Sequence, residues 1–215
     1  MVHELSYGSR LGDKTDLFDW LPKFRFDMDQ ILITDQQDAT YTDGRTNQVV
    51  LFKSCFPNNW FESKGEPPGN PSGPGMTVWN AKASYTALLK EFEKRPEVLF
   101  VCFTAPPLAY RPPRIFRQVI DKVRGRENRG LAAANLAREF NTWLVDRNGW
   151  LKDYTLSNVV VFDYYDILTG EGESNSAAYA SGSDDSHPNS EGQKKAAEAF
   201  VPLVNRAVRR VGLTL

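Results

Sequence analysis

A carboxylate and an imidazole lie three residues apart near the end of the chain, in the stretch Asp184-Asp185-Ser186-His187-Pro188-Asn189. The only other histidine, His3, lies close to the N-terminus, so His187 is the main candidate for base chemistry near neutral pH. If a turn before a helix directs Asp184 and His187 into one cleft, the carboxylate can orient the imidazole while the ring acts as general base. The alternative is a turn and helix cap without chemistry, because these residue types also favour turns and caps.

A serine hydrolase also needs a nucleophile and donors that stabilise the oxyanion. Ser54 ends an apolar run and is the candidate nucleophile, although its hydroxyl could instead bond to neighbouring backbone. Asn58 and Asn59 can supply side-chain amides to the oxyanion, and Trp60 follows them as a candidate substrate-binding residue. The G-x-S-x-G motif that marks the nucleophile in many hydrolases does not occur.

Two other side chains are weaker candidates for the nucleophile. Ser9 lies in the turn Gly8-Ser9-Arg10-Leu11-Gly12 but follows no strong strand pattern. Cys55 is intrinsically a better nucleophile than a serine, yet its place in an apolar run predicts a buried and inert thiol. Cys102 is likewise expected to be buried and reduced, and two such cysteines do not form a disulfide framework.

Three apolar, β-branched runs predict buried parallel strands at Val49–Cys55, Val98–Thr104 and Val159–Phe162. Helical spacing of apolar residues follows each run, which predicts an α/β domain with helices on both sides of a parallel sheet. Ligands bind such sheets beyond the carboxyl ends of the strands. The polar residues expected to converge there are Ser54, Asn58, Asn59, Thr104, Asp163, Asp166 and the stretch that holds Asp184 and His187.

The remaining segments give weaker signals. Thr15–Phe26 has helical spacing interrupted by Pro22, and Ile31–Thr34 fits either a strand or a helical turn. Ser190 and Gln193 form a candidate capping box for a final helix. The long Gly- and Pro-rich loop between Trp60 and Trp79 is expected to shape an aromatic-walled acyl or aryl pocket.

Composition excludes several classes of protein. The 215 residues fit a single domain, 1–215, and the formal net charge of −1 argues against nucleic-acid binding through phosphate contacts. No phosphate-binding glycine motif and no close pair of metal ligands occurs, so we expect neither a cofactor nor a metal. No apolar run reaches the roughly 20 residues of a membrane span, and no signal peptide is visible, so a cytoplasmic protein is expected unless a longer parent chain carries an export signal.

Several segments together resemble one known family. Asp184-x-x-His187-Pro188-Asn189 before a final helix resembles the last conserved block of SGNH hydrolases, the GDSL-type esterases and lipases. The segment from Val50 to Asn59 is similar to the third-strand block of one bacterial branch. Further similar segments are Val78-Trp79-Asn80-Ala81-Lys82-Ala83, Thr104-Ala105-Pro106-Pro107 and Phe140-Asn141-Thr142-Trp143-Leu144, and the likeness extends from about Tyr7 onward.

The resemblance implies a flavodoxin-like three-layer sandwich, with a parallel sheet ordered 2-1-3-4-5, and a metal-free ester hydrolase. It makes His187 the base, Asp184 its partner, and Asn58 or Asn59 the oxyanion amide. The substrates would be small-molecule, carbohydrate-linked or polymeric esters.

The chain departs from the family at the nucleophile. In the family a serine follows the first strand near the N-terminus, and we expect this chain to begin after that block. The gap in the sheet would then be filled by Ile31–Thr34, by the N-terminal segment or by a second copy in a homodimer. The alternative to an esterase is therefore a catalytically inactive binding protein or an N-terminally truncated enzyme.

Overall fold

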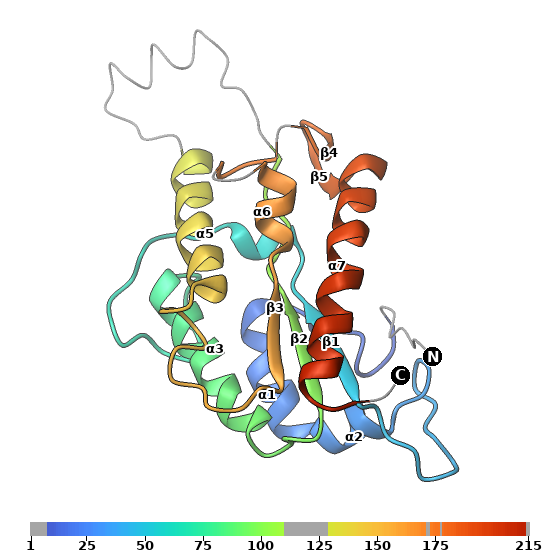
Figure 1. Ribbon diagram of the computed structural model, residues 1–215. Coiled ribbons are helices and arrows are strands. Elements are labelled where there is room, and N and C mark those ends of the chain that lie inside the picture. The colour runs from blue at the N-terminus through green and yellow to red at the C-terminus, as the bar shows by residue number, and fades with distance from the viewer. Residues whose placement is uncertain (1–7, 110–128, 171–172, 177, 214–215) are drawn as a thin grey trace, which may run out of the picture.

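A three-stranded parallel sheet forms the centre of the protein, for which the computed structural model describes residues 8–109, 129–170, 173–176 and 178–213 (Figure 1). Its strands are β1 (Val49–Lys53), β2 (Leu99–Phe103) and β3 (Val159–Phe162), in the spatial order β1-β2-β3. The three strand predictions are confirmed, because β-branched apolar runs fit a parallel sheet that is covered on its faces.

Helices lie on both faces of this sheet (Figure 1). The helical elements are η1 (Leu17–Asp19), α1 (Trp20–Phe26), α2 (Met28–Ile33), η2 (Phe56–Asn59), α3 (Val78–Phe92), α5 (Arg129–Val145), α6 (Tyr164–Thr169) and α7 (Ser190–Arg210). Of the two readings of Ile31–Thr34, the helical turn holds, because Ile31 belongs to α2. The final helix begins one residue earlier than the capping box predicts, since Asn189 is the N-cap and its side chain accepts from Gly192 N.

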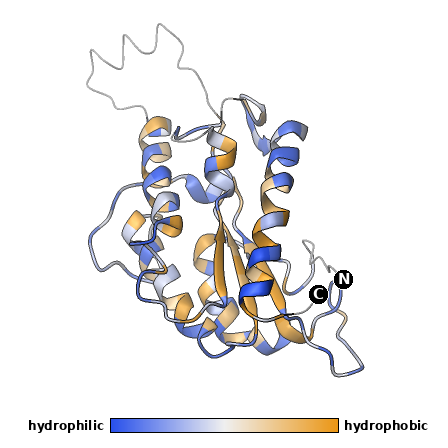
Figure 2. Ribbon diagram, viewed as in Figure 1, coloured by the Kyte–Doolittle hydropathy of each residue, from blue (hydrophilic) through white to orange (hydrophobic). Residues whose placement is uncertain are grey.

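Alternation along β2 explains the two-sided core. Phe100 and Cys102 pack in the larger cluster with α1, α3 and α5, whereas Leu99 and Val101 pack against α7. All four side chains are fully buried. Figure 2 shows the strands as hydrophobic and the outer surface of α7 as largely hydrophilic.

β1 is less covered than its sequence predicts. Among the described residues it pairs with β2 alone, and Leu51, at its centre, is 46% exposed. The expectation that every strand is buried on both faces is therefore wrong for β1. The reason is that α7 lies over β2 and β3, so the face of β1 that carries Leu51 has little above it.

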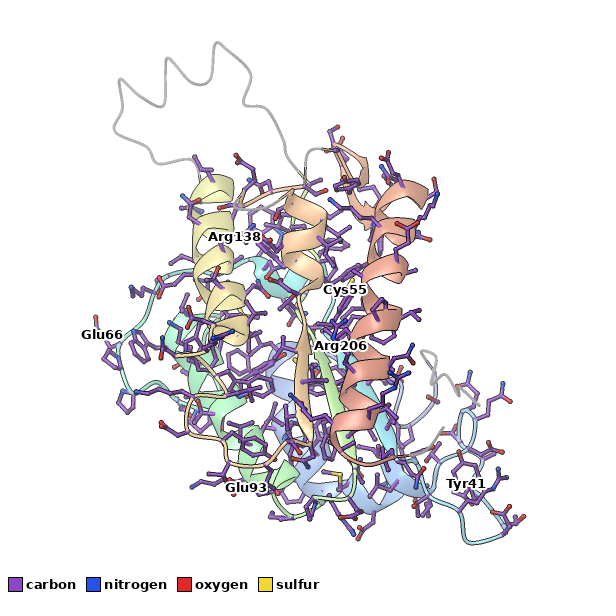
Figure 3. The ribbon with its side chains drawn as sticks, viewed as in Figure 1. Tyr41, Cys55, Glu66, Glu93, Arg138 and Arg206 are labelled. Atoms are coloured by element: carbon purple, nitrogen blue, oxygen red, sulfur yellow. The ribbon has the colours of Figure 1, made fainter. Side chains whose placement is uncertain are left out.

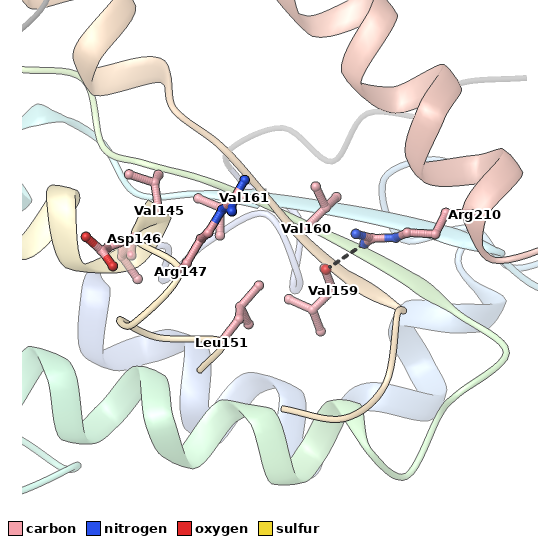
Figure 4. Close-up of a pocket in the computed structure, with 9 residues that line it drawn as sticks. Val145, Asp146, Arg147, Leu151, Val159, Val160, Val161 and Arg210 are labelled. Carbon is pink, nitrogen blue, oxygen red and sulfur yellow. Dashed lines mark hydrogen bonds between the residues drawn. The ribbon is translucent and has the colours of Figure 1, made fainter. Parts of the chain in front are cut away.

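β3 is protected at its outer edge by a side chain. Arg210, the last residue of α7, donates from Nη2 to the carbonyls of Ser157, at 2.8 Å, and Val159, at 3.0 Å. A cavity of about 330 Å³ lies beside these residues at the amino end of β3 (Figure 4). It is thus at the opposite end of the sheet from the predicted site.

A buried carboxylate ties α1 to α3. Glu91 accepts a hydrogen bond from Arg25 Nε at 3.0 Å and forms an ion pair with Lys94. Burial alone would raise the pKa of Glu91, but the hydrogen bonds from Lys94 and Arg25 outweigh it and hold this pKa below its usual range.

We expect Glu91→Gln to lower the free energy of unfolding at pH 7 by about 1 kcal/mol, because both cations are partly exposed and the pairs are screened. Since the folded-state pKa is lowered, this stabilisation is present above the ordinary glutamate pKa and is lost as the pH falls through the folded value. Urea unfolding at pH 7 and at pH 3 measures the difference between wild type and variant. An equal difference at the two pH values would contradict the assignment.

Candidate active site

The stretch that carries His187 forms a β-hairpin rather than the predicted loop. Its strands are β4 (Ala180–Gly182) and β5 (Asp185–Pro188), which pair antiparallel. Side chains alternate along β5, so Ser186 points inward, where its hydroxyl accepts from Ala109 N at 2.9 Å. Asp185 and His187 therefore share the opposite, exposed face.

Asp185 holds the imidazole in place. Its Oδ1 lies 2.7 Å from His187 Nδ1 and also accepts from the backbone N–H of His187 at 2.9 Å. These two hydrogen bonds lower the pKa of Asp185. The sequence predicts Asp184 as the partner of the imidazole, but the structure places Asp185 there. The reason is that side chains alternate along β5, so Asp185 shares a face with His187, whereas Asp184 precedes the strand.

The hairpin places His187 at the carboxyl edge of the sheet. The ring packs edge-on against Phe56, with ring centroids 5.0 Å apart and an interplanar angle of 89°. Phe56 begins η2, three residues after β1 ends. The His187 side chain is 64% exposed, and its Nε2 makes no hydrogen bond to any residue in the described ranges.

Ser54 lies on the other side of the sheet, in the core. It follows Phe52 by two residues and shares its buried face, where its Oγ accepts from Trp20 Nε1 at 2.8 Å. Only 2% of Ser54 is exposed, so an ester in solution cannot reach its hydroxyl. The hydroxyl is thus used within the fold, as in the alternative, but its partner is the Trp20 side chain and not neighbouring backbone.

Cys55 points to the side of the sheet that Ser54 does not. It is partly exposed, so the predicted burial is wrong for Cys55. Cys102 is buried as expected, and burial raises the pKa of its thiol. Figure 3 shows Cys55 between α6 and α7, near the carboxyl edge. Burial raises the pKa of Tyr164, and the charge of the Cys55 thiolate raises it further.

Asn58 is buried and serves to fix η2. Its Oδ1 accepts from Leu17 N at 2.6 Å, and its Nδ2 donates to Asp16 Oδ1 at 2.8 Å and to Cys55 O at 3.3 Å. Both amide hydrogens are therefore used inside the protein. The structure does not direct them toward an oxyanion.

Asn59 is also buried and links η2 to the segment after β2. Its Nδ2 donates to Pro106 O at 2.7 Å and to Ala105 O at 3.3 Å, while its Oδ1 accepts from Asn141 Nδ2 at 3.0 Å. Its amide hydrogens are thus also engaged. Trp60, which follows η2, is 45% exposed and is the member of the predicted binding set that is open to solvent.

Of the polar residues predicted to converge beyond the strand ends, Thr104 after β2 and Asp163 after β3 lie together. Thr104 Oγ1 accepts from Tyr165 N at 2.7 Å and lies 3.4 Å from Asp163 Oδ1. Burial raises the pKa of Asp163. Asp166 instead turns toward α5, where it pairs with Arg138 at 2.6 Å.

The loop between Trp60 and Trp79 lies elsewhere. It runs along α3 and α5, on the far side of the molecule from the β4–β5 hairpin (Figure 1). A cavity there has aromatic walls, as expected, but it lies away from His187. It is therefore a separate feature and not the acyl pocket of this site.

Within the ranges that the structure describes, no group of three His, Cys, Asp or Glu side chains could hold a metal ion. None of the described helices is long and apolar enough to span a membrane. Comparisons with protein-family models, curated proteins and solved structures found no match for the chain.

Proposed function

We propose that this protein is an SGNH-like ester hydrolase with a flavodoxin-like sandwich, in which His187 is the general base and Asp185 orients it. The observation that carries the proposal is the 2.7 Å contact between Asp185 Oδ1 and His187 Nδ1. The ring of His187 packs against Phe56 at the carboxyl edge of the parallel sheet. A carboxylate on Nδ1 fixes the ring and leaves Nε2 for proton transfer.

Cys55 is the nucleophile in this proposal. It is partly exposed and directly precedes Phe56, on which the imidazole packs. Ser54 is a poorer candidate, because it is buried and its hydroxyl already accepts a hydrogen bond from Trp20. A thiol next to a histidine base is an established arrangement for acyl transfer.

The proposed reaction has two stages. Nε2 of His187 takes the proton of the Cys55 thiol as sulfur attacks the ester carbonyl, and the imidazolium returns that proton to the departing alcohol. Water, deprotonated by the same nitrogen, then attacks the thioester carbonyl. The Cys55 sulfur leaves and takes the proton back from the imidazolium, so that the acid is released and the thiol is restored. Asn58 and Asn59 act by holding η2, and thereby Cys55 and Phe56, in place.

Hydrolysis of a short-chain aryl ester tests the nucleophile. We expect Cys55→Ala to lower kcat/KM by about 10³-fold or more, because the acyl intermediate cannot form. The matched variant Ser54→Ala should keep the wild-type rate but lose about 1–3 kcal/mol of stability, since the buried indole N–H of Trp20 loses its acceptor. Loss of the rate in Ser54→Ala, with Cys55→Ala unchanged, would overturn this assignment.

A second candidate function is binding of an ester or carbohydrate ligand without turnover. The observation that favours it is that the amides of Asn58 and Asn59 are committed to internal carbonyl and carboxylate groups. In that case wild type and both variants would show the same background rate. In that case a phosphonate or iodoacetamide probe, followed by peptide mapping, would label Cys55 no faster than it labels a free thiol in solution.

A further inference from the structure

A groove of about 570 Å³ lies between the Gly- and Pro-rich loop and the outer face of α3. Its lining includes Pro68, Gly69 and Pro71 from the loop and the two indole side chains of Trp79 and Trp143. This volume is in the range of pockets that bind small ligands. The groove is remote from the β4–β5 hairpin, so it is independent of the proposed catalytic site.

The two indole rings of the lining are held by a cation. Lys82 Nζ lies 5.1 Å from the ring centroid of Trp79 and 5.7 Å from that of Trp143. The ammonium also pairs with Glu139 of α5 at 3.2 Å, and the Lys82 side chain is only 13% exposed. These contacts fix both indole rings before any ligand arrives.

The groove is cationic. Its lining includes Arg25, Lys82 and Lys90 and no carboxylate. The two acidic side chains that pair with these cations do not belong to the lining, and each is shared by two cations: Glu139 pairs with Lys82 and Lys64, and Glu91 with Arg25 and Lys94. A negatively charged ligand would therefore be attracted.

The cations are spread along the groove. Trp79, Lys82, Thr86 and Lys90 fall on one face of α3 at helical spacing. Lys82 and Lys90 are eight residues apart, which is about 12 Å along a helix. A ligand that meets both must be extended and must carry more than one negative charge.

We propose that this groove binds an acidic oligosaccharide, a chain of uronate sugars. The polar side chains of the lining are hydrogen-bond donors (guanidinium, ammonium and indole N–H), and the Thr86 hydroxyl alone among them can also accept, so a ligand rich in acceptors fits the groove best. Carboxylates and ring oxygens of uronates meet this need, whereas the N–H groups of an acidic peptide would find few side-chain acceptors. The apolar face of a pyranose ring packs on an indole ring.

Titration calorimetry with an oligogalacturonide tetramer tests the proposal, with maltotetraose as the uncharged control and oligothymidylate as a second polyanion. We expect the uronate to bind, and its affinity to fall as salt is added. Maltotetraose should bind at least tenfold more weakly. Intrinsic tryptophan fluorescence should change on binding. No uronate binding, equal binding of maltotetraose or tighter binding of the oligonucleotide would each overturn the proposal.

Variants locate the ligand. Lys90→Glu should weaken uronate binding about tenfold, whereas Lys152→Glu, at an exposed lysine outside the groove, should leave it unchanged. Thr86→Trp fills the groove from an exposed position and should abolish binding without changing the thermal midpoint. Undiminished binding by Lys90→Glu and Thr86→Trp would show that the ligand sits elsewhere. His187→Ala should bind as wild type does, so failure of the esterase proposal leaves this one intact.

Discussion

Replacing His187 with alanine is expected to reduce ester hydrolysis by about 10³-fold or more, because a general base of this kind contributes roughly 10²–10⁴-fold and also activates the nucleophile. The loss should fall on kcat rather than KM, since the ring acts on protons and not on substrate binding. His187 is 64% exposed, so its removal should change the thermal midpoint little. Steady-state kinetics with an aryl ester, together with thermal unfolding of the same samples, measures both effects.

The two adjacent carboxylates provide a matched control for this result. Asp185→Ala removes the group that touches Nδ1 and should lower kcat by at least tenfold, whereas Asp184→Ala should stay close to wild type. The opposite ranking would mean that the working enzyme uses the pairing that the sequence predicts. Full activity in His187→Ala would end the hydrolase proposal.

Asn59→Ala is expected to cost about 3 kcal/mol of stability, or roughly 6–12 °C in the unfolding midpoint for a chain of this size. The side chain bonds to two backbone carbonyls, of Ala105 and Pro106, and to the amide of Asn141. Alanine would leave all three groups buried without these partners, and each carries a desolvation penalty. Urea and thermal unfolding both report the loss.

Asn148→Ala is the control for Asn59, because Asn148 is exposed and should change stability by less than about 0.5 kcal/mol. Asn59→Asp adds a further test, since it keeps an acceptor for Asn141 but loses both donors. We expect it to be at least as destabilising as alanine at pH 7, where it buries a charge. Near-native stability in Asn59→Ala would mean that the network tolerates loss of its centre.

The sheet was predictable because its strands are short runs of residues that suit a covered parallel sheet. Val159–Phe162 consists of three valines and a phenylalanine, a composition that favours a strand regardless of its neighbours. The meeting of Thr104 and Asp163 beyond the strand ends also follows from parallel topology alone. Exposure of Leu51 could not be foreseen, because it depends on where α7 lies and not on the strand itself.

The details of the site depend on alternation that the sequence hides. Asp, Ser and Pro are poor strand formers, so β5 carries no apolar signal and its two-residue period is not visible in the sequence. Once β5 is a strand, Asp185 and not Asp184 must share a face with His187. The same alternation, continued beyond β1, directs the side chains of Ser54 and Cys55 to opposite faces of the sheet. Counting by twos from the apolar Phe52 is the signal that could have assigned Ser54 to the core.

The contact that Arg210 makes with Ser157 and Val159 has a consequence for association through the outer edge of β3. An intruding strand would need these backbone oxygens as its first docking points, and a bulky, charged guanidinium already occupies them. Trimming the chain by a few residues at the end of α7 would therefore open this flank of β3 to strand exchange between molecules. A single side chain at a helix end thus blocks the addition of a strand at this edge of the sheet.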